Sequence, residues 1–247
     1  MNITILSGGR GSENIIKALL QNKKNHITSV INTFDDGKST GVIREFFNMP
    51  GPSDIRKIHS MYLDSKELNY AIYKKLYDYR IINQKNNKVL SALKSYIDKK
   101  NLRIFNFNLK DKFINEFIRI NLNYFYNHII KKNNKIKKFN FNDCSLMNCV
   151  YAGSYIKNNK SILKTIIEFE NIFKLRGNVI PISNKNLFLS AILENGKILE
   201  SEDSIINKKI KKKIKQLVIT KKPTNIILKK PYNVNSYKKL LIHNYKY

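Results

Sequence analysis

The sequence predicts an α/β fold: a Rossmann-like, open and mostly parallel sheet with a helical insertion and a C-terminal β-hairpin. An apolar run at residues 3–6 leads into a glycine-rich turn, after which apolar positions recur at helical spacing. Residues 27–33 are rich in β-branched side chains and complete a βαβ unit of roughly thirty residues. Asn195-Gly196, between two apolar runs, predicts the hairpin.

Three polar, glycine-bearing turns fall where strands of this sheet are expected to end. They are Ser-Gly-Gly-Arg-Gly-Ser at 7–12, Phe-Asp-Asp-Gly-Lys-Ser-Thr-Gly at 34–41 and Gly-Pro-Ser-Asp-Ile-Arg-Lys at 51–57. A right-handed crossover places the first two turns on one edge of the sheet. Ligands of open α/β sheets bind outside the carboxyl ends of the strands, so these turns are the first candidates for a functional site.

The remaining elements follow from periodicity and capping residues. Ser12 is expected to cap the first helix, and Ser53 or Asp54 a helix that runs to about residue 64. Arg176-Gly177 is expected to end a helix that begins at 161. The other predicted elements are two helices within 67–100, a short strand at 105–109, helices at 111–130 and from 146, and strands at 178–182, 187–193, 197–200 and 214–220.

We expect residues 1–247 to form one domain, because 247 residues with 42% hydrophobic side chains suffice for one sizeable core. Within it, residues from about 65 to 140 form the helical insertion, and 207–247 form a basic C-terminal segment. The basic run at 131–138 is expected to be a surface loop.

The formal net charge of +28 has two interpretations. Clustered lysine and arginine are typical of a nucleic-acid surface. Here the excess is nearly all lysine, spread along the chain and mixed with Asn, Ile, Tyr and Phe, as a strongly AT-rich genome encodes in any protein. We favour the second interpretation, and the positive field attracts phosphorylated metabolites in either case.

Cysteine usage and the N-terminus are typical of a cytoplasmic protein. Cys144 and Cys149 match neither a CxxC pair nor a secreted disulfide framework, so we expect them to stay reduced. The N-terminal apolar run has no basic flank and is too short for a signal peptide or a membrane span.

The first turn has the composition of a phosphate-binding loop. Gly8, Gly9 and Gly11 allow a tight turn with N–H groups close to a ligand, and the following helix adds unpaired donors and a partial positive charge. Asn14 stands where a GxGxxG motif has its third glycine. A tight turn without a ligand is the alternative, and Arg10 inside the loop favours anion binding.

The second turn carries two carboxylates and two hydroxyls. Asp35 and Asp36 directly follow the second strand, where they can hold a hard cation, orient a sugar hydroxyl or act as a base on an attacking alcohol. An ordinary Asp-Asp-Gly turn and a ribose-binding acid are the alternatives. Ser39 and Thr40 are suited to a second phosphate.

Three further residues are candidates for the site at this edge of the sheet. Asp54 and Arg56 either complete that site or serve as a helix cap and a surface arginine. Asn148 either reaches an anion or base, or acts as a polar cap. The four histidines have no metal-ligand spacing such as HExxH.

Together these motifs resemble the 2-phospho-L-lactate transferase (CofD) family and its bacterial relatives, the gluconeogenesis-factor or UPF0052-like proteins. The order of the three turns is more specific than any single turn. The resemblance continues in Leu-Met-Asn-Cys-Val-Tyr-Ala-Gly at 146–153 and Arg-Gly-Asn-Val-Ile-Pro at 176–181, so it covers roughly residues 1–206. It implies a Rossmann-like domain whose cleft holds a nucleotide-linked substrate.

The transferase branch moves phospholactate from a guanosine diphospho carrier to a deazaflavin alcohol with magnesium. On this hypothesis, Mg²⁺ and Asp36 activate or orient the acceptor, while loop amides and Arg10 stabilise the developing phosphate charge. The resemblance implies phosphate or nucleotide binding at Gly8, Gly9, Arg10, Gly11, Ser39, Thr40, Asp54, Arg56 and Asn148, and catalysis or Mg²⁺ binding at Asp35 and Asp36.

Two other functions stay open at this point. The Asp-Asp turn is more similar to the bacterial branch, whose members bind UDP-sugars and regulate carbon flow or wall synthesis, so one alternative is a non-catalytic UDP-sugar-binding regulator. The other is a basic nucleic-acid-binding protein. The family chain usually continues into a further strand and a Gly-Pro-Gly-Ser/Thr loop, which this sequence lacks. We therefore expect a partial site, one completed in a homodimer or by a separate polypeptide, or a decaying copy of a family member.

Overall fold

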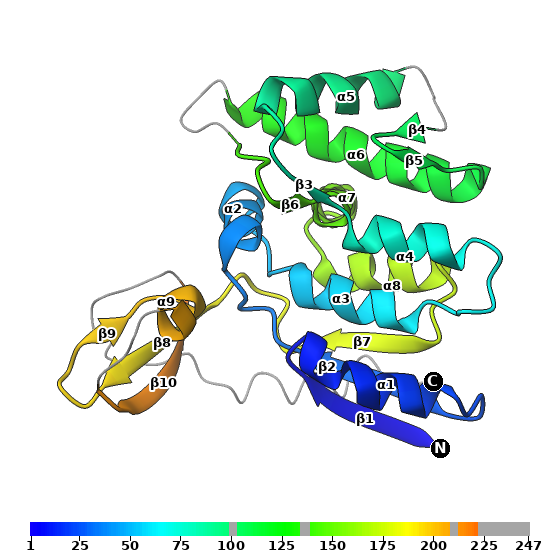
Figure 1. Ribbon diagram of the computed structural model, residues 1–247. Helices are drawn as coiled ribbons and strands as arrows, with labels where there is room; N and C mark the ends of the chain where they lie inside the picture. Colours follow the sequence, from blue (N-terminus) through cyan, green and yellow to red (C-terminus); the bar gives the residue numbers. More distant parts are fainter. Residues whose placement is uncertain (99–102, 134–138, 208–211, 222–247) are drawn as a thin grey trace.

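The computed structural model describes residues 1–98, 103–133, 139–207 and 212–221 (Figure 1). Among these residues, three parallel strands form the central sheet in the order β1-β2-β7. The strands are β1 (Asn2–Ser7), β2 (His26–Ile31) and β7 (Gly177–Pro181). The sequence prediction of an α/β fold with a parallel sheet is thus confirmed.

Helices cover one face of this sheet (Figure 1). The helix α3 (Ser53–Tyr62) contacts β2, β7 and α1 (Glu13–Leu20), and α8 (Ile162–Ile172) contacts β7. The hydroxyls of Ser29 on β2 and Tyr62 on α3 are 2.6 Å apart and tie the two layers together. The opposite face is more open, and Leu6 on β1 is 84% exposed.

The predicted helical insertion lies beyond these helices (Figure 1). It contains α4 (Tyr70–Asp78), α5 (Asn86–Asp98) and α6 (Lys112–Asn133), and α6 packs against α7 (Leu146–Lys157). The two helix backbones approach most closely at Gly153, where a Cβ atom would lie 1.8 Å from the carbonyl oxygen of Asn121. Aromatic side chains fill the adjoining core, and Phe125 stacks on Phe47 with 5.2 Å between the ring centroids.

Short elements complete this part of the chain. The helix α2 (Lys38–Phe47) starts inside the turn predicted at 34–41, so Ser39 and Thr40 are helical. The prediction of one strand at 105–109 was wrong in detail. Two short antiparallel strands, β4 (Arg103–Ile104) and β5 (Phe107–Asn108), flank a turn there. A second short pair joins β3 (Arg80–Ile81) to β6 (Cys144–Ser145).

The C-terminal hairpin prediction is confirmed, and a third strand joins it. The described residues give an antiparallel sheet in the order β10-β8-β9, set beside the rest of the molecule (Figure 1). Gly196 has a φ of 80° in the turn that Asn195-Gly196 predicted. The elements of this lobe are β8 (Phe188–Leu193), β9 (Ile198–Leu199), α9 (Glu202–Asn207) and β10 (Ile214–Thr220).

Of three capping predictions, one was right in position only and two were wrong. Ser12 is the N-cap residue of α1, but its hydroxyl bonds to the nearby Ser7 hydroxyl and Gly9 carbonyl rather than to an amide of α1. Pro52 is the N-cap of α3, so Ser53 and Asp54 lie inside its first turn. The left-handed residue after α8 is Lys174 (φ 48°), and the glycine of Arg176-Gly177 instead begins β7.

The basic C-terminal segment predicted at 207–247 lies largely outside the described residues. The run at 131–138 is only partly described, and its residues 131–133 continue α6 rather than forming a loop. Cys144 and Cys149 are free and buried, with their sulfur atoms 3.7 Å apart. In the described ranges, no helix is both long and apolar enough to cross a membrane.

The Gly153 contact gives a direct test of the packing between α6 and α7. We expect Gly153→Ala to lower the free energy of unfolding by about 3 kcal/mol, because the added methyl group meets backbone that cannot move aside. Urea denaturation measures the effect. Gly11→Ala is the control, since a Cβ at Gly11 meets nothing within 4 Å. Equal stability of the two variants would contradict the close packing.

Candidate functional site

A cavity of about 260 Å³ lies beyond the carboxyl end of β2, between the first turns of α2, α3 and α9. It combines carboxylates, hydroxyls and cationic side chains. Two of the three predicted turns meet here. The turn at 34–41 follows β2 as expected, whereas the turn at 51–57 joins α2 to α3, so the prediction that it follows a strand was wrong. The lining residues are Asp35, Gly37, Ser39, Thr40, Ser53, Arg56, Lys57, Arg80, Glu202, Asp203 and Ile206.

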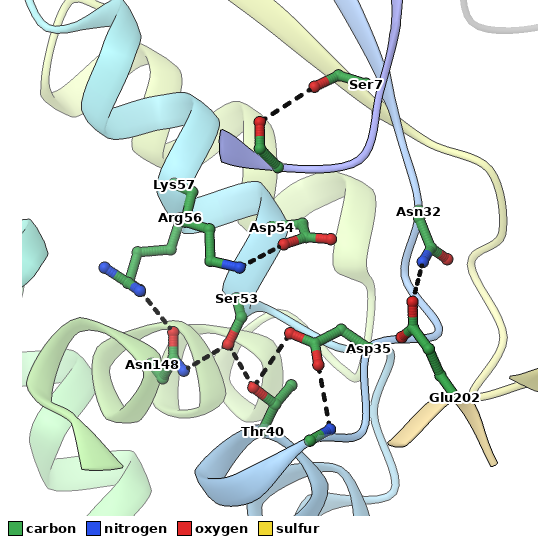
Figure 2. A network of polar contacts seen from close by, with 12 residues as sticks. Ser7, Asn32, Asp35, Thr40, Ser53, Asp54, Arg56, Lys57, Asn148 and Glu202 are labelled. Atoms are coloured by element: carbon green, nitrogen blue, oxygen red, sulfur yellow. Dashed lines mark hydrogen bonds and ion pairs between the residues drawn. The ribbon is translucent and has the colours of Figure 1, made fainter. Parts of the chain in front are cut away.

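A chain of hydrogen bonds runs along the wall of this cavity (Figure 2). The Thr40 hydroxyl lies 3.4 Å from Asp35 Oδ2 and 2.5 Å from the Ser53 hydroxyl. Asn148 Nδ2 donates to Ser53 Oγ at 3.0 Å, and Arg56 Nε donates to Asn148 Oδ1 at 3.0 Å. The chain links α2, α3 and α7 and fixes the positions of the hydroxyls.

Arg56 and Asn148 lie at the buried end of this chain. Asn148 is fully buried and Arg56 is 3% exposed, so the sequence alternative of a surface arginine is wrong. Arg56 also donates to the Tyr77 carbonyl and lies 3.9 Å from the Asp78 carboxylate. Burial lowers the pKa of Arg56, and Asp78 opposes that shift. The guanidinium is thus a fixed cation on the inner wall.

Two partly exposed cations face the cavity from α3 and β3. Lys57 Nζ pairs with Asp54 at 2.8 Å, and Arg80 Nε pairs with Asp143 at 2.5 Å. Arg80 also lies 3.4 Å from the Ser39 hydroxyl. Both side chains retain access to solvent, so both can approach an anion in the cavity.

Of the two carboxylates predicted for catalysis or Mg²⁺ binding, Asp35 lines the cavity. Its Oδ1 accepts a hydrogen bond from the Gly37 amide at 3.1 Å. Burial and the nearby Asp54 raise the pKa of Asp35, while the Gly37 amide and Lys57 oppose the shift. The negative charge is therefore incompletely compensated by the protein, and a cation beside Asp35 would stabilise it.

Sequence reasoning missed Glu202 and Asp203, which α9 brings from the C-terminal lobe (Figure 2 shows Glu202). Glu202 Oε1 accepts from Asn32 Nδ2 at 3.3 Å, and its buried Oε2 accepts no hydrogen bond from the described part of the chain. Burial, followed by Asp35 and other acidic neighbours, raises the pKa of Glu202 to about 7. No local pattern at Ser-Glu-Asp indicates this position, because it depends on how the lobe packs.

Asp36 has a different position from Asp35. Its Oδ1 accepts a hydrogen bond from the backbone amide of Asp203 at 2.9 Å, and it is not among the residues that line the cavity. A Cβ at Gly41 would lie 2.3 Å from the Asp36 carbonyl oxygen, so this turn requires glycine. Asp36 therefore connects the turn to α9.

The glycine loop adjoins the cavity through α3 rather than lining it. Gly9 has a φ of 90°, and a Cβ there would lie 2.7 Å from Asp54 Oδ1. A Cβ at Gly8 or Gly11 would meet nothing within 4 Å, and Arg10 is exposed. Of the predicted site residues, the cavity itself brings together Asp35, Ser39, Thr40 and Arg56, with Asp54 and Asn148 directly behind them.

The donor set limits how Mg²⁺ can bind. Within the described residues, no group of three or more His, Cys, Asp or Glu side chains is arranged to hold a metal ion. Mg²⁺ commonly binds through one or two carboxylates together with substrate phosphates and water. Asp35, with its incompletely compensated charge, fits that manner of binding.

The profile of the family described as 2-phospho-L-lactate transferase CofD matches residues 3–231. The chain belongs to the CofD family. The match confirms the resemblance drawn from the three turns and extends past residue 206. Among curated relatives, a protein of Aquifex aeolicus is 22% identical over 208 residues, which are 83% of this CofD-family chain and 45% of that protein. The gluconeogenesis factor of Halalkalibacterium halodurans is 23% identical over 223 residues, which are 90% of this CofD-family chain and 50% of that protein.

Solved structures show the same fold. A crystal structure of a UPF0052-family protein from Bacillus halodurans gives a TM-score of 0.60 at 21% identity, covering 89% of this CofD-family chain and 51% of that chain. A second crystal structure of the same Bacillus halodurans protein gives a TM-score of 0.60 at 22% identity. The match covers 95% of this CofD-family chain and 54% of that chain. This CofD-family chain thus spans about half the length of the relatives it matches.

The environment of Glu202 predicts a pH-dependent stability. Its carboxyl has an ordinary pKa of 4.5 and a folded pKa of about 7, so the folded state binds the proton more tightly. The resulting stabilisation is complete below pH 4.5 and is lost as pH rises through about 7. Glu202→Gln mimics the protonated form, and we expect it to melt at a higher temperature than the wild type at pH 8 but not at pH 4.5.

Thermal melting at a series of pH values measures this effect. Glu194→Gln, in the exposed hairpin turn, removes the same charge at a position outside the cavity and is the control. If the melting temperatures of Glu202→Gln and the wild type differ by the same amount at every pH, the result would contradict the raised pKa of Glu202.

Proposed function

We propose that this chain binds a nucleotide-linked substrate through its phosphates in the 260 Å³ cavity and transfers a phosphoryl-linked group to an alcohol. The observation that carries the proposal is the convergence of two helix N-termini and three cations beside the carboxylate of Asp35. The helices α2 and α3 direct their first turns at the cavity, and Arg56, Lys57 and Arg80 line it. Helix N-termini and cationic side chains together favour bound phosphate.

Each part of the cavity has a distinct place in this transfer. Lys57 and Arg80, which have solvent access, approach the phosphate oxygens, and Arg56 adds fixed positive charge from the buried wall. Such preorganised charge stabilises the oxygens on which negative charge accumulates during transfer. Ser39 and Thr40 supply hydroxyl groups whose positions the hydrogen-bond chain holds. The acceptor oxygen forms the new bond to phosphorus as the bond from that phosphorus to the bridging oxygen of the nucleotide breaks, and the nucleotide leaves with that oxygen.

Asp35 faces the acceptor side of the cavity in this proposal. Mg²⁺ would be held between Asp35 and the substrate phosphates, where it supplies charge neutralisation. Asp35 orients the acceptor hydroxyl or receives its proton as the acceptor attacks phosphorus. Asp36, bonded to the Asp203 amide, keeps α9 against the turn.

A second function uses the same cavity without turnover. The relative from Halalkalibacterium halodurans is described as a gluconeogenesis factor, which favours a regulator that binds a nucleotide sugar. Long incubation with bound UDP-sugars or nucleotide-linked acids separates the two proposals. Product formation supports the transferase, whereas binding without product supports the regulator.

The variant Asp35→Asn tests the cavity and its cation together. In the wild type, we expect Mg²⁺ to tighten binding of pyrophosphate, because it screens the Asp35 carboxylate from the anion. Asp35→Asn is expected to bind pyrophosphate more tightly than the wild type without Mg²⁺ and to lose most of the Mg²⁺ enhancement. Isothermal titration calorimetry measures both affinities.

Asp64→Asn is the matched control, since Asp64 lies outside the cavity lining. It should keep the wild-type affinities with and without Mg²⁺. Wild-type protein that binds no pyrophosphate, or an Asp35→Asn variant that behaves as Asp64→Asn does, would contradict the proposed function.

A further inference from the structure

A second and larger cavity, of about 690 Å³, lies between α4 and β5. Neither the sequence motifs nor the proposed transfer uses it. Its lining combines aromatic, amide and cationic side chains. The lining residues are Ile72, Lys74, Lys75, Asp78, Tyr79, Asn106, Phe107 and Asn108.

Two aromatic rings form the apolar part of this cavity. Tyr79 and Phe107 are perpendicular, with 5.0 Å between their centroids, and Phe105 supports Tyr79 at 5.6 Å without lining the cavity. Tyr79 and Phe107 are partly exposed rather than buried. Half-buried rings of this kind offer a surface on which another flat ring can stack.

The second cavity adjoins the first. Arg56 lines the first cavity and Asp78 lines the second, and the Arg56 guanidinium lies 3.9 Å from the Asp78 carboxylate. Lys74, which also lines the second cavity, pairs with Asp78 at 3.5 Å. The Arg56–Asp78 ion pair thus joins the linings of the two cavities.

The sizes of the two cavities argue for one ligand that extends over both. The first cavity holds about 260 Å³, and pockets that enclose a ligand of ordinary size hold roughly 300–1,000 Å³. It can therefore accept the phosphates of a nucleotide but not the nucleoside as well. The second cavity, at about 690 Å³, has room for the nucleoside.

We infer that the second cavity binds the nucleobase of the substrate whose phosphates occupy the first cavity, with the base stacked on Phe107 and in edge contact with the perpendicular ring of Tyr79. The inference rests on the proposed function. The exposed amides of Asn106 and Asn108 supply both donors and acceptors for the polar edge of a base.

Calorimetric titration of the full chain with GDP, UDP, guanosine, uridine and pyrophosphate tests the inference. We expect the wild type to bind at least one nucleoside diphosphate more tightly than pyrophosphate, and Phe107→Ala to weaken that nucleotide about tenfold. The same variant should leave pyrophosphate affinity unchanged. Phe113→Ala removes an exposed ring that lines neither cavity and should leave both affinities unchanged.

Asn108→Trp is the second variant, because Asn108 is exposed and an indole there fills the cavity without removing a core contact. It should weaken nucleotide binding as Phe107→Ala does. Nucleotide affinity that survives both variants would overturn the inference while leaving the proposed function intact. If pyrophosphate does not bind the wild type, the proposed function fails. In that case, titration with guanosine and uridine tests the base site by itself. Nucleoside binding that both Phe107→Ala and Asn108→Trp weaken supports the base site, and any other result overturns it.

Discussion

The arrangement of the candidate site depends on the hydrogen bonds that the Arg44 guanidinium donates. The residue is fully buried, and its guanidinium donates to the carbonyls of Phe34, Asp35 and Leu187 and to Asn186 Oδ1. Burial lowers the pKa of Arg44 to about 10, so the side chain keeps its charge at neutral pH. One side chain of α2 thereby joins the Asp35 turn to the start of the C-terminal lobe.

This connection explains how three distant segments form one cavity. The carbonyls that Arg44 binds belong to the turn after β2 and to the segment before β8, so the position of the lobe is set relative to Asp35. α9 then brings Glu202 within reach of Asn32, and the Asp203 amide within reach of Asp36. Burial and the resulting group of carboxylates raise the pKa of Glu202. In the proposed function, Arg56, Lys57 and Arg80 attract phosphate to the same cavity, and Asp35 would hold Mg²⁺.

The sequence was sufficient for the fold and for part of the site. Strands and helices were predicted because β-branched runs and helical spacing are local properties, and the turn at 34–41 lines the candidate cavity because it follows the carboxyl end of β2. The turn at 51–57 reaches the cavity differently, because it joins α2 to α3 and follows no strand. Side-chain capping failed at Ser12 because its hydroxyl bonds to nearby loop atoms of Ser7 and Gly9. Arg80 and Glu202 were missed because β3 and α9 acquire their positions only through packing between segments far apart in the chain.

The central claim is that the cavity between α2, α3 and α9 is the phosphate site. A crystal structure of the protein with Mg²⁺ and pyrophosphate tests it most directly. If this cavity is the phosphate site, electron density for the anion lies within hydrogen-bond distance of Lys57 and Arg80, with the metal ion beside Asp35. Density for pyrophosphate at the glycine loop or on surface lysines, with only water in this cavity, would show that the phosphate site lies elsewhere.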